Sequence, residues 1–419
     1  MAANPQAFSL ANPHALSCIV EASATRRIVA SQDIFDDRGT KLWARDQPVS
    51  PSLHERLLQR KLRHPLEACL RAEDGVGIME LHDALATFIA SHHALAQVAR
   101  PFEDRLLHEV KRLPLHAVVQ LLLTTSHATK PEVFEHAVRG MALAGAMQMS
   151  VKSDPYDHRL AMLGGLLHDL GEMYVNPKYL DGSQKLDIRS YRHVATHPRV
   201  GELLLATTTD YPMALARAVG EHHERLDGTG YPMRATGGAL SPLGRLLAIT
   251  ETALGIASAP RAPLARISFA LRMIPGEYEP GWIGFLATAA TQAQEDIKAV
   301  LPDADALNTR LSLMDTTLAQ IDEQARILAA RTDVSSVAQE VARNVSTRVE
   351  RLRVGGNAIG LWSTASNNDS PESLFELTTA MGEIGYRLNC LERDCLWPHP
   401  DVSTEDAERL APLWPIWNA

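Results

Sequence analysis

The residues best suited to chemistry in this sequence lie in one short stretch, 222–232. It begins with His222, His223 and Glu224 and continues through a glycine-hinged turn to Tyr231. Imidazoles and carboxylates are the groups with which transition-metal ions are commonly bound in proteins. Two adjacent histidines, an acid and the turn that follows them therefore predict metal-supported chemistry.

A second polar fragment, His168 followed by Asp169, comes at the end of an apolar run. Residues 161–167 are all small or apolar, which predicts a buried helix. Adjacent polar groups in buried surroundings need several partners, and metal ions would provide them. We expect this fragment and the stretch at 222–232 to act together.

Further candidate ligands are spread through residues 126–300, which are predicted to be helical apart from a loop at 226–244. A dinuclear metal site needs roughly five to seven imidazole and carboxylate groups. A carboxylate such as Asp169 can bridge two metals, while the flanking imidazoles bind one metal each. In chain order, the candidate ligands are Glu132, His136, His168, Asp169, His197, His222, His223 and Glu251.

Each candidate also has an ordinary explanation. Glu132 follows Pro131 in the first turn of a helix predicted to run to Met149, where the helix dipole favours an acid with or without a metal. A lone histidine such as His136 or His197 is more often a core, surface or helix-cap residue. The combined set is harder to explain without metal ions.

The composition bounds the class of protein. The chain has 419 residues, 45% of them hydrophobic and 22% charged, which predicts a soluble globular protein of two or three domains. No apolar run approaches the roughly 20 residues of a membrane-spanning helix, and residues 1–5 lack the features of a signal peptide. The four scattered cysteines do not make a disulfide framework. We expect a cytoplasmic protein with reduced thiols and no membrane partner.

The charge distribution limits the kind of ligand that the protein can bind. A net charge of -9 argues against a protein that coats DNA or RNA polymers, because that mode depends on a basic face. An anionic small substrate needs local positive charge instead. Between Arg225 and Arg272 the sequence has six arginines and two acids. This segment is either a phosphate-binding region or a solvated surface.

The sequence divides into three predicted regions, and the predicted fold class is mostly α. Residues 1–125 form an N-terminal module with a β-hairpin at 28–49, followed by a helix that opens at Pro51 and by nearly unbroken helical patterns. Residues 126–300 hold all the candidate ligands. Residues 301–419 form a C-terminal helical extension.

The C-terminal extension carries a heptad seam. Apolar residues at 307–328 are spaced alternately by four and three, over about three repeats. A parallel coiled coil would make the protein a homodimer, and an antiparallel pair with residues 334–349 of the same chain fits equally well. A polar loop is predicted at 355–370 and a last helix at 371–393, while the tail after Trp397 shows no pattern.

With these residues in view, the segment from about 130 to 300 resembles an HD-GYP domain, a branch of the HD metal-dependent phosphohydrolases. The resemblance rests on the HD signature at 168–171 and on a nearly complete second signature at 222–232. It implies a helical bundle and a bacterial phosphodiesterase for cyclic di-GMP or a related cyclic dinucleotide. The expected products are pGpG and, in some members, GMP, and the expected nucleophile is a water activated by two divalent metal ions.

The resemblance also implies roles for individual residues. The expected metals are iron or manganese, and Glu132 falls where some members hold a third ion, so two metals are predicted and a third is left open. Asp227, Gly228, Gly230 and Tyr231 are expected at the lip of the substrate pocket. Arg245 and Arg261 are the first candidates to hold the second phosphate. The metal ligands carried over from the family are His136, His168, Asp169, His197, His222 and His223.

The sequence departs from the family pattern at two places. Glu172 stands in the catalytic centre, three residues after Asp169, where active members usually have lysine, and its charge would repel a phosphate unless it binds metal or turns outward. Glu251 stands where aspartate is usual, and the arginine-rich segment that usually follows is altered at 259–263. Two hypotheses follow: an active phosphodiesterase tuned by the N-terminal module, or a weak or inactive domain that binds nucleotide, metal or a partner as a regulator.

Overall fold

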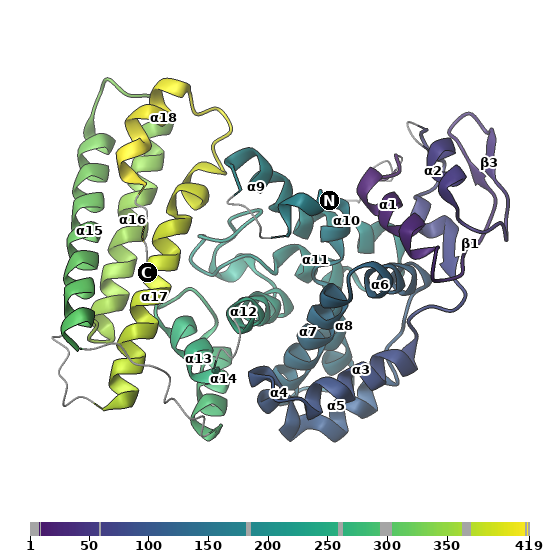
Figure 1. Cartoon of the computed structure of the whole chain (residues 1–419), viewed down its shortest axis with the longest axis horizontal. Helices are drawn as coiled ribbons and strands as arrows, with labels where there is room; N and C mark the ends of the chain where they lie inside the picture. The colour runs from purple at the N-terminus through teal and green to yellow at the C-terminus, as the bar shows by residue number, and fades with distance from the viewer. Residues whose placement is uncertain are drawn as a thin grey trace. The chain divides into compact units, whose positions relative to one another are not determined.

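The protein is mostly helical, as predicted, with a small β module near its N-terminus (Figure 1). The computed structural model describes residues 8, 10–57, 60–181, 186–258, 263–293, 304–362, 370–414 and 417. By packing, the chain forms two compact units, one of Met1–Lys185 with His193–Arg261 and the other of Leu186–Arg192 with Ala262–Ala419. The predicted boundaries at 125 and 300 stay a prediction, and all the candidate metal ligands belong to the first unit.

The N-terminal part of the first unit contains two small antiparallel sheets. The predicted hairpin is present between β2 (Ile34–Phe35) and β3 (Lys41–Trp43), whereas β1 (Ile28–Ala30) pairs with β4 (Leu70–Ala72). The sequence analysis was wrong to continue helical structure through the β4 segment. Pairing with a strand about forty residues earlier in the chain overrides the local pattern there.

The helices of this N-terminal part are short. The helix predicted to open at Pro51 is α2 (Pro51–Leu57), and Leu62, within the segment predicted to continue as helix, instead forms a β-bridge with Asp36. The remaining elements before the metal-ligand region are α1 (Pro13–Ala22), η1 (Leu66–Cys69), α3 (Ile78–Ala90), α4 (Ala94–Ala99), η2 (Arg100–Phe102), α5 (Glu103–Val110) and α6 (Ala117–Thr129).

The centre of the first unit is the antiparallel pair α7 (Pro131–Met149) and α8 (Pro155–Leu167), and both helices agree with the sequence prediction. Proline opens each helix, at a position where its missing N–H costs nothing. The helices approach closely at Gly140 and Gly165, because a Cβ on either residue would collide with the backbone carbonyl of the other. Close packing at this crossing brings the ends of the helices, and the polar residues there, into one region.

The other helices of the first unit surround this pair. The α12 helix packs on both α7 and α8, and α10 packs on η3 and α11. These elements are η3 (Leu170–Tyr174), η4 (Pro177–Tyr179), α10 (His197–Thr208), α11 (Met213–Glu221), η5 (Gly237–Ala239) and α12 (Pro242–Ala257), and α9 (Ile188–Val194) falls on the boundary between the two units.

All the regular elements among the described residues of the second unit are helices. The apolar seam of α15 (Ala304–Ala330) is buried against α16 (Ser336–Ala358) and α17 (Pro371–Leu396) of the same chain. The pairing within one chain is therefore confirmed, and the seam is not free for a homodimer. The other elements of this unit are α13 (Leu264–Arg272), α14 (Pro280–Gln292), α18 (Thr404–Leu410) and η6 (Ala411–Leu413).

Two predictions for the C-terminal region were wrong in detail. The α16 helix continues to Ala358, into the segment expected to be loop, and α18 forms within the tail where no pattern was found. The last helix was predicted at 371–393 and ends three residues later, at Leu396. Within the described part of the chain, no helix is both long and apolar enough to cross a membrane.

Candidate metal centre

Helix ends bring the candidate ligands together in the first unit. His168 and Asp169 follow the last turn of α8, His197 is the first residue of α10, and His222 and His223 follow the last residue of α11. Two more come from helix interiors, with His136 on α7 and Glu251 on α12. Seven of the eight residues predicted as metal ligands thus lie in one cluster.

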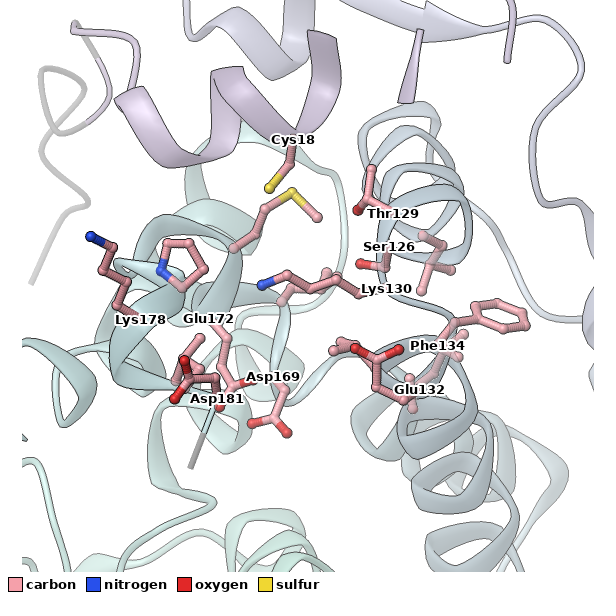
Figure 2. Close-up of a pocket in the computed structure, with 18 residues that line it drawn as sticks. Cys18, Ser126, Thr129, Lys130, Glu132, Phe134, Asp169, Glu172, Lys178 and Asp181 are labelled. Carbon is pink, nitrogen blue, oxygen red and sulfur yellow. The ribbon is translucent and has the colours of Figure 1, made fainter. Parts of the chain in front are cut away.

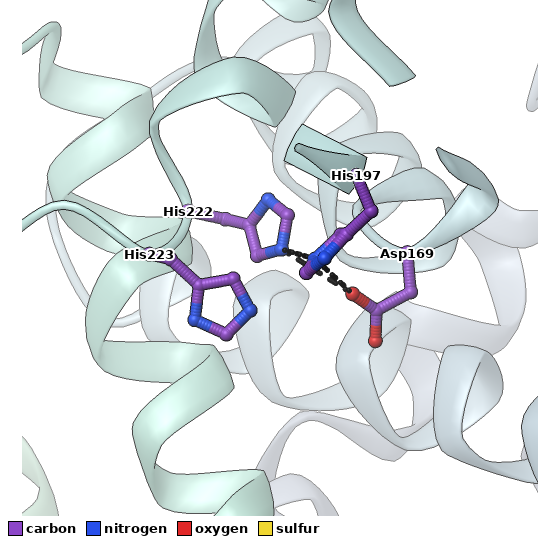
Figure 3. A group of neighbouring side chains, drawn as sticks. All are labelled: Asp169, His197, His222 and His223. Atoms are coloured by element: carbon purple, nitrogen blue, oxygen red, sulfur yellow. Dashed lines mark hydrogen bonds and ion pairs between the residues drawn. The ribbon is translucent and has the colours of Figure 1, made fainter. Parts of the chain in front are cut away.

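One group of ligand atoms comprises Asp169, His197, His222 and His223, and Figure 3 shows how these side chains converge. Their ligand atoms all lie within 4.8 Å of one another. The Nε2 atoms of His197 and His222 are 3.0 Å apart. Oδ1 of Asp169 lies 3.4 Å from the first of these nitrogens and 3.3 Å from the second.

The second group comprises His136, His168, Asp169 and Glu251, again within 4.8 Å. Here Asp169 uses its other oxygen, with Oδ2 at 3.2 Å from His136 Nε2 and 3.0 Å from His168 Nε2. Oε2 of Glu251 lies 3.3 Å and 3.1 Å from the same two nitrogens. Asp169 therefore directs one oxygen to each group, which is the arrangement of a carboxylate that bridges two metals.

Backbone hydrogen bonds fix the orientation of three imidazoles. In His168, His197 and His222, Nδ1 donates to the carbonyl oxygen three residues earlier, over 2.9, 2.8 and 2.6 Å respectively. A hydrogen bond at one ring nitrogen sets the tautomer and leaves the other nitrogen as the metal ligand. The Nε2 atoms that face the cluster are therefore the free ligand atoms.

The donor set fits divalent metal ions. Two imidazole nitrogens that both lack a proton repel each other at about 3 Å unless a cation lies between them. In addition, Oδ1 of Asp169 is buried and has no hydrogen-bond partner among the described residues, although such atoms are nearly always paired. A metal beside each group would satisfy both the nitrogens and this oxygen.

The carboxylates control the charge of the cluster. Burial by itself lowers the pKa of His136, but the hydrogen bonds and charges of Asp169 and Glu251 outweigh it and raise the pKa to about 9. Burial likewise acts to raise the pKa of Asp169, and the surrounding imidazoles hold it well below its usual range. The pKa of His223, in contrast to that of His136, is lowered, because burial and the neighbouring imidazoles disfavour a proton.

The loop at 222–232 is held by a buried acid that the sequence analysis did not select. Glu224 has no exposed surface, and its carboxylate accepts hydrogen bonds from the backbone N–H groups of Met233 and Ala235. Gly230 is required because a Cβ there would meet the backbone of residues 223–225 at 2.5 Å. An acid next to a histidine pair in a glycine-rich turn was the available signal for this role.

Further contacts place the expected substrate-binding residues of the loop. The Tyr231 ring stacks on the His223 ring, with centroids 4.4 Å apart and planes at 18°. The Asp227 carboxylate accepts hydrogen bonds from Thr229, and Gly228 has a φ of 77°, which glycine adopts without strain. These contacts shape the turn, and its contact with substrate stays a prediction.

Of the two arginines predicted to hold a phosphate, Arg245 lies within the described part of the chain. Nε and Nη2 of Arg245 donate to the backbone oxygens of Leu240 and Gly237, at 3.3 and 3.1 Å, so at least part of the guanidinium braces the loop. Arg261 lies outside the described residues. The role of both in phosphate binding stays a prediction.

A pocket of about 410 Å³ opens beside Asp169. Figure 2 shows residues of α1, α6, α7 and η3 around it, including Cys18 from the N-terminal helix and Lys130 from the link between α6 and α7. Sequence reasoning missed both of these residues. Only the fold places them here, because they lie about 150 and 40 residues before Asp169 in the chain.

Two predicted acids line this pocket and lie outside both ligand groups. Glu132 is exposed in the first turn of α7, so its place as ligand to a third metal stays a prediction. The pKa of Glu172 is raised to about 7, chiefly by burial and then by the charge of Asp169. Glu172 therefore sits in the pocket, close enough to the metal ligands to respond to their charges.

Comparison with known proteins locates a family in the same segment. Residues 123–274 match the family model described as HD domain. A cyclic di-GMP phosphodiesterase of Pseudomonas aeruginosa is 30% identical over 204 residues, which cover 49% of this chain and 47% of that protein. A 3′3′-cGAMP-specific phosphodiesterase of Vibrio cholerae is 33% identical over 138 residues, covering 27% of this chain and 30% of that protein. The chain thus spans less than half the length of these curated relatives.

The match and the geometry concern the same residues. Both signatures, at 168–171 and at 222–232, lie inside the matched segment, and they carry four of the seven clustered ligands. Residues 123–274 therefore match an HD domain, in agreement with the resemblance of this segment to the HD-GYP branch.

Proposed function

We propose that the protein hydrolyses a phosphodiester bond of a cyclic dinucleotide, with cyclic di-GMP as the first candidate. The expected product is pGpG, or GMP after a second cleavage. The observation that carries the proposal is the position of Asp169, which directs one carboxylate oxygen to each of two imidazole-rich groups. The names of the relatives, which specify cyclic di-GMP and 3′3′-cGAMP, supply the substrate class.

The cofactors that we propose are two divalent ions, iron or manganese, in the two groups that share Asp169. His197, His222 and His223 would hold one ion, and His136, His168 and Glu251 the other. When bound, such ions activate water near neutral pH and offset negative charge on phosphate oxygens. The third ion suggested by Glu132 is left outside the proposal.

The chain's own residues would keep this site in place. The carbonyl bonds to Nδ1 hold His168, His197 and His222 with Nε2 inward, so no imidazole has to turn when substrate enters. Glu224 holds the loop after His223 by two backbone hydrogen bonds. The ring of Tyr231, stacked on His223, then offers a flat surface beside the cluster on which a guanine base can pack.

Product analysis tests the proposal. The protein is purified without oxygen, loaded with Fe²⁺ or Mn²⁺, and incubated separately with cyclic di-GMP and 3′3′-cGAMP. A full-length variant that combines His168→Ala with Asp169→Ala serves as the blank, because it removes ligands from both groups. We expect a linear dinucleotide or a mononucleotide only with the unmodified protein. Intact substrates despite confirmed metal loading would contradict the proposal and favour a domain that binds nucleotide or a partner as a regulator.

A further inference from the structure

Lys130 is a half-buried lysine that reaches into the pocket beside the metal centre. Figure 2 shows its ammonium group directed between Cys18 of α1 and Glu172 of η3. Among the residues that the structure describes, no carboxylate lies within ion-pair distance of it, and its side chain makes no hydrogen bond there. An ammonium group that faces a pocket without a partner in the protein is available to an anionic ligand.

The local backbone explains why this side chain leaves the helix. Lys130 lies between the last residue of α6, Thr129, and the first residue of α7, Pro131. A proline disfavours helical geometry at the residue before it, and Lys130 accordingly has φ and ψ of -144° and 75°. Its N–H still donates to the backbone oxygen of Ser126 at 2.7 Å, which holds the link. The bend is thus fixed by sequence, and it turns the lysine toward the pocket.

The position of Cys18 on α1 agrees with this direction of the side chain. The thiol of Cys18 lies on the wall of the pocket, where burial raises its pKa and the charge of Lys130 acts to lower it. Charges act this way only over short distances. Lys130 and Cys18 thus line the same pocket, with the ammonium group on the side of α1 (Figure 2).

An anionic ligand in this pocket needs a cationic partner, because acidic side chains outnumber basic ones on the pocket wall. Its wall carries four carboxylates and two lysines, and Asp169 faces the metal groups. The second lysine, Lys178, is exposed, and Arg245 donates to its own loop. With Glu172 in the position where the resemblance leads us to expect lysine, a phosphate on this side of Asp169 has Lys130 as its half-buried cationic neighbour.

We propose that Lys130 binds the phosphate of the cyclic dinucleotide that is not being cleaved, and so sets affinity for the dianionic ring. This inference rests on the proposed function and names a substrate-binding residue for it. The pocket volume of about 410 Å³ lies in the range of small-molecule sites, about 300 to 1,000 Å³. Because Lys130 is fixed between two helices that frame the pocket, it requires no loop closure to reach the phosphate.

The test compares four full-length, metal-loaded proteins: the unmodified chain, Lys130→Met, Lys130→Arg and Lys152→Met. Lys152 is an exposed lysine outside the pocket wall, so its replacement controls for loss of one positive charge. The binding probe is the bis-phosphorothioate analogue of cyclic di-GMP, chosen because it resists hydrolysis, and KM and kcat are measured with cyclic di-GMP. Metal content and thermal midpoint are measured for every protein, so that a folding defect is recognised.

We expect Lys130→Met to weaken binding of the analogue by about tenfold or more, the size expected for a lost charged hydrogen bond. KM should rise by a similar factor with a smaller change in kcat, Lys130→Arg should restore most of the affinity, and Lys152→Met should match the unmodified chain. Equal binding by Lys130→Met with unchanged metal content overturns the inference, as does failure of the unmodified chain to bind the analogue.

The two proposals fail separately. Binding that depends on Lys130, without cleavage of any cyclic dinucleotide, would contradict the proposed function and leave the role of Lys130 standing. Cleavage with a KM that does not depend on Lys130 would support the proposed function and contradict the role of Lys130. If the Lys130→Met protein does not fold, Lys130→Arg decides the test. Its affinity for the analogue must then stay close to that of the unmodified chain.

Discussion

Gly140 of α7 and Gly165 of α8 face each other so closely that neither position has room for a Cβ. A Cβ at Gly140 would also lie 3.2 Å from the His168 ring, which is itself 3.2 Å from the His136 ring between Nε2 atoms. The helix crossing and the spacing of two ligands are therefore linked. Whatever separates the helices also separates the ligands.

We expect Gly140→Ala and Gly165→Ala to destabilise the protein by about 1–3 kcal/mol, the usual cost of overpacking, and to weaken metal binding at the same time. Thermal unfolding and metal titration measure the two effects. Gly255→Ala on α12 is the matched control, because no described residue outside the helix's own backbone has an atom within 4 Å of a Cβ there, and it should stabilise the helix by about 0.5–1 kcal/mol. If both destabilised variants kept full metal affinity, the helix crossing would not control the spacing of the ligands, and the prediction would be wrong.

The shared carboxylate predicts an uneven pattern of metal loss. Asp169→Asn should weaken both ions, whereas Glu251→Gln should weaken only the ion of its own group and His223→Ala only the other. Because we propose these residues as direct ligands, each loss should exceed the about 10- to 100-fold effect of outer-shell changes. Metal content per chain after gel filtration, followed by titration, checks this. Equal loss of both ions in all three variants would contradict two separate groups.

Glu172 is predicted to limit turnover through its charge. Replacing it by Gln or Lys should raise kcat/KM for cyclic di-GMP by about tenfold or more, since like charges a few ångströms apart cost on the order of 1–4 kcal/mol near a protein surface. Glu172→Asp keeps the charge and should show no such gain. Steady-state kinetics of metal-loaded proteins give the answer. Loss of turnover or of metal in Glu172→Gln would instead give Glu172 a direct part in the site.

A buried acid away from the metal ligands predicts a pH dependence of stability. Glu67 is 3% exposed, and burial raises its pKa even though the Tyr174 hydroxyl donates to it at 2.7 Å. A carboxyl with a higher pKa in the folded state binds its proton more tightly there. Stability should therefore fall as the pH rises above the ordinary value of 4.5 and level off above the folded-state pKa.

Calorimetry between pH 4.5 and 8 checks this prediction. Glu67→Gln keeps an acceptor for Tyr174 but carries no charge, so its thermal midpoint should fall less over this range than that of the unmodified protein. Each unit of upward pKa shift corresponds to about 1.4 kcal/mol. Glu55→Gln changes an exposed acid of the same N-terminal part and should behave like the unmodified protein. Parallel curves for Glu67→Gln and the unmodified protein would show that Glu67 does not titrate differently in the folded state.

The parts of the fold that follow from local sequence were predicted well. Pro131 and the apolar periodicity after it define α7, and the apolar run at 161–167 predicts the last turns of α8, but not its start at Pro155. The pairing of β1 with β4 could not, because it depends on contacts between segments about forty residues apart. Local periodicity does not report contacts between distant segments, and in the β4 segment it favoured a helix.

The pocket shows the same limit. Cys18 and Lys130 carry no signal in the sequence, and only the packing of α1, α6 and η3 brings them beside Asp169. The acid of the loop is an intermediate case: Glu224 was visible in the motif, but its two hydrogen bonds to Met233 and Ala235 depend on the path of the turn. Ligand types can be predicted from spacing, whereas the walls around them need the fold.

The N-terminal helix does more than precede the matched segment. Asn12 of α1 donates to the backbone oxygen of Tyr174, the ring of Phe8 packs on the Tyr174 ring, and Cys18 lines the pocket. A fragment cut at residue 123, where similarity to the family begins, would keep every clustered ligand and lose one side of the cavity. The segment that matches the family model is thus shorter than the part of the chain that builds the pocket.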